Sequence, residues 1–113
     1  MSKLALELLA KVGSGPERCG LVLTDGVVVE LPNRSDDPTT TFRLAKEDMA
    51  FYLEDGIAGS WHTHPNGPAN LSLADLQAFK EFPEWSHYVA SPGVVVAFRV
   101  EDGWVLNDWR FEA

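Results

Sequence analysis

Two histidines separated by a single residue follow a short apolar run, and this arrangement limits most strongly how the chain can fold. The run covers residues 57–61, and His62 and His64 come directly after it. If this segment is a β-strand, both imidazoles point to the same face, because side chains alternate along a strand. A loop at 65–68 that contains proline and glycine can then turn the chain back toward Asp75. We therefore expect a strand, a loop and a returning segment that bring two ring nitrogens and one carboxylate together.

This combination of ligand types is typical of a catalytic zinc site. Three protein ligands, here His62, His64 and Asp75, would hold one ion and leave a fourth position open for water. Zinc lowers the pKa of such a water to about 7, which makes it a nucleophile at neutral pH. The sequence thus predicts one Zn²⁺ per chain.

The same segment also fits a structural role. Ser72, followed three residues later by Asp75 and then by apolar residues at helical spacing, is typical of a helix N-terminus. Ser72 would cap the helix and Asp75 would lie in its first turn. The two roles are compatible, since a carboxylate at a helix start can face a metal. Between the ligands, Asn66, Gly67 and Asn70 form either a substrate contact or a plain connector.

Length, composition and charge restrict the class of protein. A chain of 113 residues, 45% of them hydrophobic, suits one core, so we expect a single domain over residues 1–113. Glu7 interrupts the first apolar stretch and no run of about 18 apolar residues occurs, so we expect a cytoplasmic protein without a membrane span. The net charge of -8 argues against nucleic acid and anionic membranes and favours a polypeptide partner. The single cysteine, Cys19, excludes an internal disulfide and a multi-cysteine zinc site.

Apolar periodicity and turn residues predict a mixed α+β domain. Helices are expected at 3–12, 45–53 and 73–82. Strands are expected at 19–23 and 27–31, joined by an Asp-Gly hairpin turn, at 57–64, and in an antiparallel meander at 88–90, 94–100 and 104–111. Residues 33–41 are expected to form a polar loop. The order of elements predicts a largely antiparallel sheet packed against a few helices.

Amide hydrolysis at a metal also needs a base, and the sequence contains no His-Glu-x-x-His helix to supply it. Glu17, just before the expected strand at 19–23, is the place to look, although a glutamate after proline is ordinarily exposed. Cys19 is expected to pack in the core. His87 is expected to be partly exposed and not to bind metal, and Trp61 to serve in packing.

Three motifs in this order resemble the JAMM signature of the JAB/MPN zinc peptidases. They are Glu17-Arg18-Cys19-Gly20, His62-Thr63-His64-Pro65 and Ser72-x-x-Asp75. The chain is most similar to the prokaryotic branch, especially the tail-assembly proteins of lambda-like phages. Those proteins share the Glu-x-Cys-Gly start, the stretch at 41–48 and the His-x-His-Pro loop. The resemblance extends over residues 5–100.

The resemblance implies a three-layer, cytidine-deaminase-like α+β fold with a specific set of roles. His62, His64 and Asp75 would ligate zinc, Glu17 would be the general base, and Ser72 would hydrogen-bond the oxyanion. The implied activity is hydrolysis of a peptide or isopeptide bond in a polypeptide such as a ubiquitin-like or phage tail protein. Two alternatives stay open: a structural or assembly protein that keeps the fold, and a small-molecule amidohydrolase that uses the same water.

Overall fold

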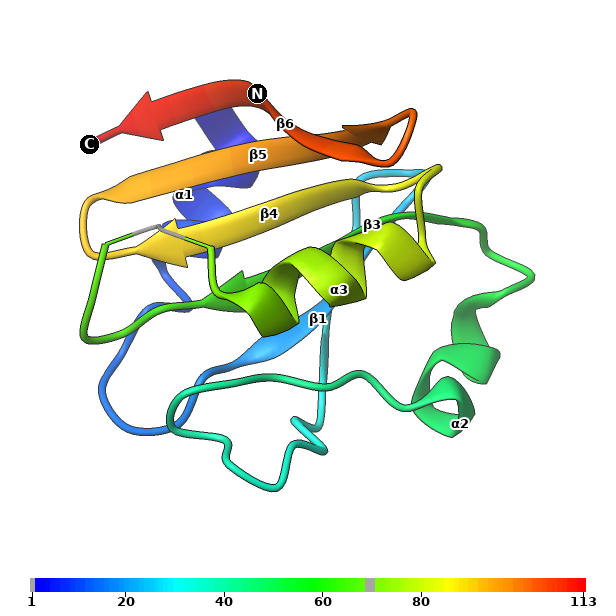
Figure 1. Ribbon diagram of the computed structural model, residues 1–113, viewed down its shortest axis with the longest axis horizontal. Coiled ribbons are helices and arrows are strands. Elements are labelled where there is room, and N and C mark those ends of the chain that lie inside the picture. Colours follow the sequence, from blue (N-terminus) through cyan, green and yellow to red (C-terminus); the bar gives the residue numbers. More distant parts are fainter. Residues whose placement is uncertain (1, 69–70) are drawn as a thin grey trace.

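A single sheet of six strands, in the order β2-β1-β3-β4-β5-β6, organises the computed structural model, which describes residues 2–68 and 71–113 (Figure 1). The strands are β1 (Cys19–Leu23), β2 (Val28–Leu31), β3 (Ile57–Thr63), β4 (Ser86–Ser91), β5 (Val94–Glu101) and β6 (Trp104–Glu112). Neighbouring strands are antiparallel except β3 and β4, which run parallel. Asn70, expected in the loop between the ligands, lies outside the described residues. The hairpin, the C-terminal meander and the largely antiparallel sheet are confirmed.

Helices cover both faces of the sheet and complete a three-layer arrangement (Figure 1). On one face, α1 (Ser2–Leu9) packs through Leu8 against Trp61. On the opposite face, α3 (Leu73–Glu81) packs through Phe79 in a separate apolar cluster. The expected α+β fold in three layers is therefore confirmed. Among the residues described, no helix is long and apolar enough to span a membrane.

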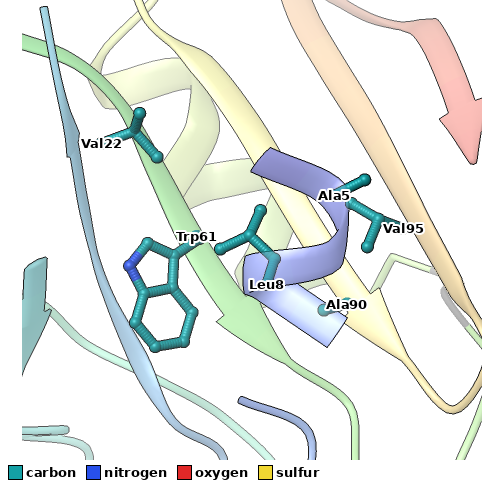
Figure 2. Packing of buried hydrophobic residues seen from close by; sticks show 6 residues of the cluster. All are labelled: Ala5, Leu8, Val22, Trp61, Ala90 and Val95. Carbon is teal, nitrogen blue, oxygen red and sulfur yellow. The ribbon is translucent and has the colours of Figure 1, made fainter. Parts of the chain in front are cut away.

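The layer beneath α1 joins residues that are far apart in the sequence. Figure 2 shows this cluster, which consists of Ala5, Leu8, Val22, Trp61, Ala90 and Val95. Trp61 is fully buried, and its Nε1 donates a hydrogen bond to the carbonyl oxygen of Val29 at 3.0 Å. Because side chains alternate along β3, this anchoring of Trp61 directs His62 to the opposite face, where α3 lies.

Two of the helices are shorter than the periodicity predicts. The first ends at Leu9, and tight turns then carry the chain onward through hydrogen bonds from Lys11 N to Leu8 O and from Val12 N to Leu9 O. The second consists of α2 (Lys46–Met49) continued by the 3₁₀ turn η1 (Ala50–Tyr52). Its N-cap is an alanine, which offers no side-chain hydrogen bond to the first turn.

The expectation that His87 is partly exposed is wrong. His87 lies on β4 with only 1% of its surface exposed and stacks on Phe79 with ring centroids 4.4 Å apart. Its Nε2 lies 3.0 Å from the Phe82 carbonyl, which can only accept, so this nitrogen carries the proton. Its Nδ1 then accepts from the Ser60 hydroxyl at 2.7 Å. Burial lowers the pKa of His87, so the ring is a neutral, satisfied core residue.

Gly20 provides a test of how tightly β1, β2 and Trp61 are packed. A Cβ at this position would lie 1.9 Å from the carbonyl oxygen of Val29 and 2.7 Å from Nε1 of Trp61. We expect Gly20→Ala to lower the free energy of unfolding by about 2–3 kcal/mol, because the backbone must shift to admit the methyl group. Gly13→Ala is the control, since nothing lies within 4 Å of a Cβ there. Chemical denaturation would contradict the interpretation if both variants unfolded like the wild type.

Candidate metal centre

The end of β3 and the start of α3 bring the three expected metal ligands together. The Nε2 atoms of His62 and His64 lie 3.1 Å apart. Asp75 Oδ1 lies 3.3 Å from His62 Nε2, and Asp75 Oδ2 lies 3.3 Å from His64 Nε2. His62 is fully buried and Asp75 is 2% exposed, whereas His64 is partly accessible. The two ring nitrogens therefore lie next to each other, and each of them faces a different oxygen of the Asp75 carboxylate.

The spacing of these atoms is close to the spacing of ligand atoms around a zinc ion. Ligand atoms at about 2.0–2.1 Å from a tetrahedral zinc lie about 3.3 Å from one another. The observed separations of 3.1 and 3.3 Å agree with this value. His64 Nδ1 lies 3.1 Å from the Pro68 carbonyl, which can only accept, so Nδ1 is the donor and a neutral His64 ring would present the lone pair of Nε2 to a metal. The three residues therefore fit a divalent metal of this type.

The charges of the cluster also suit a cation. Burial alone would raise the pKa of Asp75, but the hydrogen bonds with His62 and His64 outweigh burial and hold this pKa well below its usual range. Burial lowers the pKa of His62 and favours the neutral ring that a metal ligand must be. An ionised carboxylate in so buried a place needs a cationic partner. Burial lowers the pKa of His64, but the hydrogen bond with Asp75 and the neighbouring negative charges together outweigh burial and raise it, so either a protonated His64 or a bound cation would supply that charge.

Ser72 and Asp75 form a capping box at the start of α3. Ser72 Oγ accepts a hydrogen bond from the Asp75 backbone N–H at 3.1 Å, and the Ser72 N–H donates to Asp75 Oδ2 at 3.1 Å. The structural role expected of these residues is thus confirmed. It leaves Asp75 Oδ1 free for His62, so capping and metal binding are compatible. Ser72 is exposed, and its hydroxyl hydrogen is not used in the capping bond.

Glu17, two residues before the start of β1, places its side chain beside His62 and His64. Its side chain is buried, contrary to what is usual for a glutamate after proline, with 6% of its surface exposed. A carboxylate oxygen lies within 4.8 Å of nitrogens of both His62 and His64, a gap that one water can bridge. Oε1 has no hydrogen-bond partner among residues 2–68 and 71–113. Burial raises the pKa of Glu17 to about 7.

An open cleft of about 260 Å³ lies over these groups. Its lining consists of Glu17, Thr39, Thr40, His64, Pro65, Asn66, Gly67 and Ser72. Residues 65–67 therefore border the cleft. Phe42 stacks on His62 with ring centroids 4.0 Å apart and an interplanar angle of 16°. The motifs of the sequence gave Phe42 no role, because its partner lies 20 residues further along the chain.

The three-layer fold and the His-His-Asp cluster beside a buried glutamate define a JAB/MPN-type domain. A model of the family described as prokaryotic homologs of the JAB domain matches residues 4–111, and the chain belongs to this family. The solution structure of protein DSY2949 from Desulfitobacterium hafniense is similar, with a TM-score of 0.72 and 25% sequence identity. That match covers 91% of this chain and 84% of the other. No curated protein matches the chain.

Zinc stoichiometry can decide which carboxylate is the third ligand. Both oxygens of Asp75 lie 3.3 Å from ring nitrogens, so we expect Asp75→Ala and His62→Ala to lose stoichiometric zinc. Glu17→Gln should keep about one zinc per chain, because Glu17 is not needed to complete the three protein ligands. Elemental analysis of the purified variants, with circular dichroism to verify folding, makes the measurement. If Glu17→Gln lost zinc and Asp75→Ala kept it, Glu17 rather than Asp75 would be the third metal ligand.

Proposed function

We propose that the protein is a zinc-dependent hydrolase that cleaves an amide bond in a polypeptide. The observation that carries this proposal is the buried Glu17 carboxylate, which has one unpartnered oxygen and lies beside the cluster of His62, His64 and Asp75. Within residues 2–68 and 71–113, this oxygen has no hydrogen bond that would explain its burial structurally. Membership of the JAB family supports the same conclusion.

The proposed mechanism assigns one task to each group. His62, His64 and Asp75 would hold the zinc, which when bound lowers the pKa of a water to about 7 and polarises a carbonyl oxygen. Glu17 accepts a proton from the attacking water and delivers it to the leaving nitrogen. Burial raises the pKa of Glu17 above its usual value, which makes this carboxylate a stronger base for accepting and returning a proton. The Ser72 hydroxyl, at the rim of the cleft, donates to the oxyanion.

The cleft favours a polypeptide substrate. It is open rather than enclosed and is bordered by two turns, which include Thr39 and Thr40 on one side and Asn66 and Gly67 on the other. Ubiquitin-like proteins and phage tail proteins are the substrates to test first, and the phage setting and cytoplasmic location stay predictions. A net charge of -8 favours substrates that are neutral or basic.

Glu17→Gln is the test of the proposed base. The amide keeps the size of the side chain but cannot carry the proton, so we expect zinc content to be unchanged and turnover to fall by about 10²–10⁴-fold. The substrates would be quenched peptides, isopeptide-linked ubiquitin-like conjugates and phage tail proteins, assayed with and without a chelator. Full activity in Glu17→Gln would place the base elsewhere. A zinc-loaded wild type that cleaves none of them would favour the structural or assembly role, and cleavage of small amides alone would favour an amidohydrolase.

Ser72 is expected to affect both stability and rate. Ser72→Ala removes the capping acceptor of α3, which should cost about 1 kcal/mol of folding free energy. It also removes the proposed oxyanion donor, which should lower kcat by about 100-fold. Ser72→Thr keeps the hydroxyl and should restore most of both quantities. A Ser72→Ala enzyme with reduced stability but normal kcat would leave Ser72 with the capping role alone.

A further inference from the structure

We infer that Asn33 is a positioning residue for the proposed hydrolytic site, because its side chain holds the main chain of Glu17 and closes the loop whose Phe42 packs on His62. Asn33 lies shortly after β2 and is half-buried. It is neither a ligand nor part of the cleft lining. Its catalytic consequence rests on the proposed function, whereas its contacts with Glu17 and the loop stand independently.

The Asn33 amide uses its whole hydrogen-bonding capacity. Its nitrogen donates to the carbonyl oxygens of Glu17 at 2.9 Å and Thr41 at 3.0 Å. Its oxygen accepts from the backbone N–H groups of Ser35 and Arg43, each at 3.1 Å. An asparagine amide offers two donor hydrogens and two acceptor lone pairs, so every one is occupied. The partners are fixed main-chain groups, which leaves the side chain a single orientation.

These contacts join the two ends of the loop at 34–43. Besides the bonds of Asn33, the N–H of Arg34 donates to the carbonyl of Arg43 at 3.0 Å. Phe42, which stacks on His62, lies at this closed end of the loop. It comes directly between Thr41 and Arg43, the two residues there that Asn33 contacts. The Asn33 side chain therefore holds the two ends of the loop together and fixes the main chain on both sides of Phe42, whose ring covers His62.

Asn33 and the loop at 34–43 together hold both main-chain polar groups of Glu17. The N–H of Glu17 donates to the Pro38 carbonyl at 2.7 Å, and its carbonyl accepts from Asn33. Its carboxylate Oε1 has no partner in the described part of the chain. The main-chain contacts therefore contribute much of what sets the position of this carboxylate. A catalytic group displaced by about 1 Å can lower the rate by about 100-fold, so Asn33 would act on the reaction through Glu17.

Two substitutions separate the contacts of Asn33. Asn33→Ala removes all four hydrogen bonds, whereas Asn33→Asp retains acceptors for Ser35 and Arg43 and, when ionised, loses the donors to Glu17 and Thr41. Ser35→Ala is the matched control in the same loop. The Ser35 hydroxyl contacts Thr41 and accepts from the Asp37 N–H, but it does not contact Glu17.

Amide hydrogen exchange, followed by NMR on the full chain, tests the positioning role without any substrate. In Asn33→Ala, the amides of Glu17 and Arg43 should exchange about tenfold faster or more, because local opening becomes easier. The Thr63 amide, which donates to the Arg18 carbonyl at 2.9 Å, should keep its wild-type rate. In Asn33→Asp, Glu17 should again exchange faster. Ser35→Ala should leave the Glu17 amide unchanged.

Kinetics and zinc content complete the test. With a substrate that the zinc-loaded wild type cleaves, both Asn33 variants should keep about one zinc per chain and a wild-type KM, while kcat falls by about 100-fold. Wild-type exchange at Glu17, exchange raised equally at Thr63, or an unchanged kcat would each overturn the inference. If the wild type cleaves nothing, the proposed hydrolase fails, and exchange at Glu17 alone then decides whether Asn33 holds this residue.

Discussion

The carboxylate of Asp75 is the group on which the site depends, because it serves the helix and the histidine cluster at the same time. Oδ2 accepts the Ser72 N–H at 3.1 Å and lies 3.3 Å from His64 Nε2, while Oδ1 lies 3.3 Å from His62 Nε2. Burial of an unpaired carboxylate would cost several kcal/mol. At the N-terminus of α3 it meets the favourable end of the helix dipole and a backbone donor. The cap that begins the helix therefore also fixes the place of Asp75, the proposed third ligand.

The parallel pairing of β3 with β4 explains why that helix begins where it does. A parallel connection needs a crossover, and α3 supplies it by returning over the face of the sheet opposite α1. The crossover starts at the end of β3, so the first turn of α3 lies beside the residues that follow the strand, which include His64. Trp61 anchors β3 on the other face. The alternation of Trp61 and His62 thus places Trp61 in the apolar layer beneath α1 and His62 on the opposite face, beside α3 and the site.

The local patterns of the sequence were enough to predict much of this arrangement, and they failed where partners are distant. Strand alternation predicts that His62 and His64 share a face, and the Ser-x-x-Asp spacing predicts the cap of α3. His87 is buried through contacts with Ser60, Phe79 and Phe82, which no local pattern specifies. Asn33 likewise contacts Glu17, from which it is separated along the chain by the whole β1–β2 hairpin.

The motif Glu17-Arg18-Cys19-Gly20 can now be explained residue by residue. Gly20 admits the close approach of Val29 and Trp61, and Cys19 is a buried thiol whose pKa burial raises to about 12, so it serves in packing. Arg18 joins β3 through a hydrogen bond from its N–H to Thr63 Oγ1 at 2.9 Å. Each of these three residues has a structural partner, whereas the Glu17 carboxylate has an oxygen with none in the described residues. An unsatisfied buried acceptor costs about 1–3 kcal/mol, and this cost beside a cluster of metal-ligand side chains supports the role proposed for Glu17 as the base.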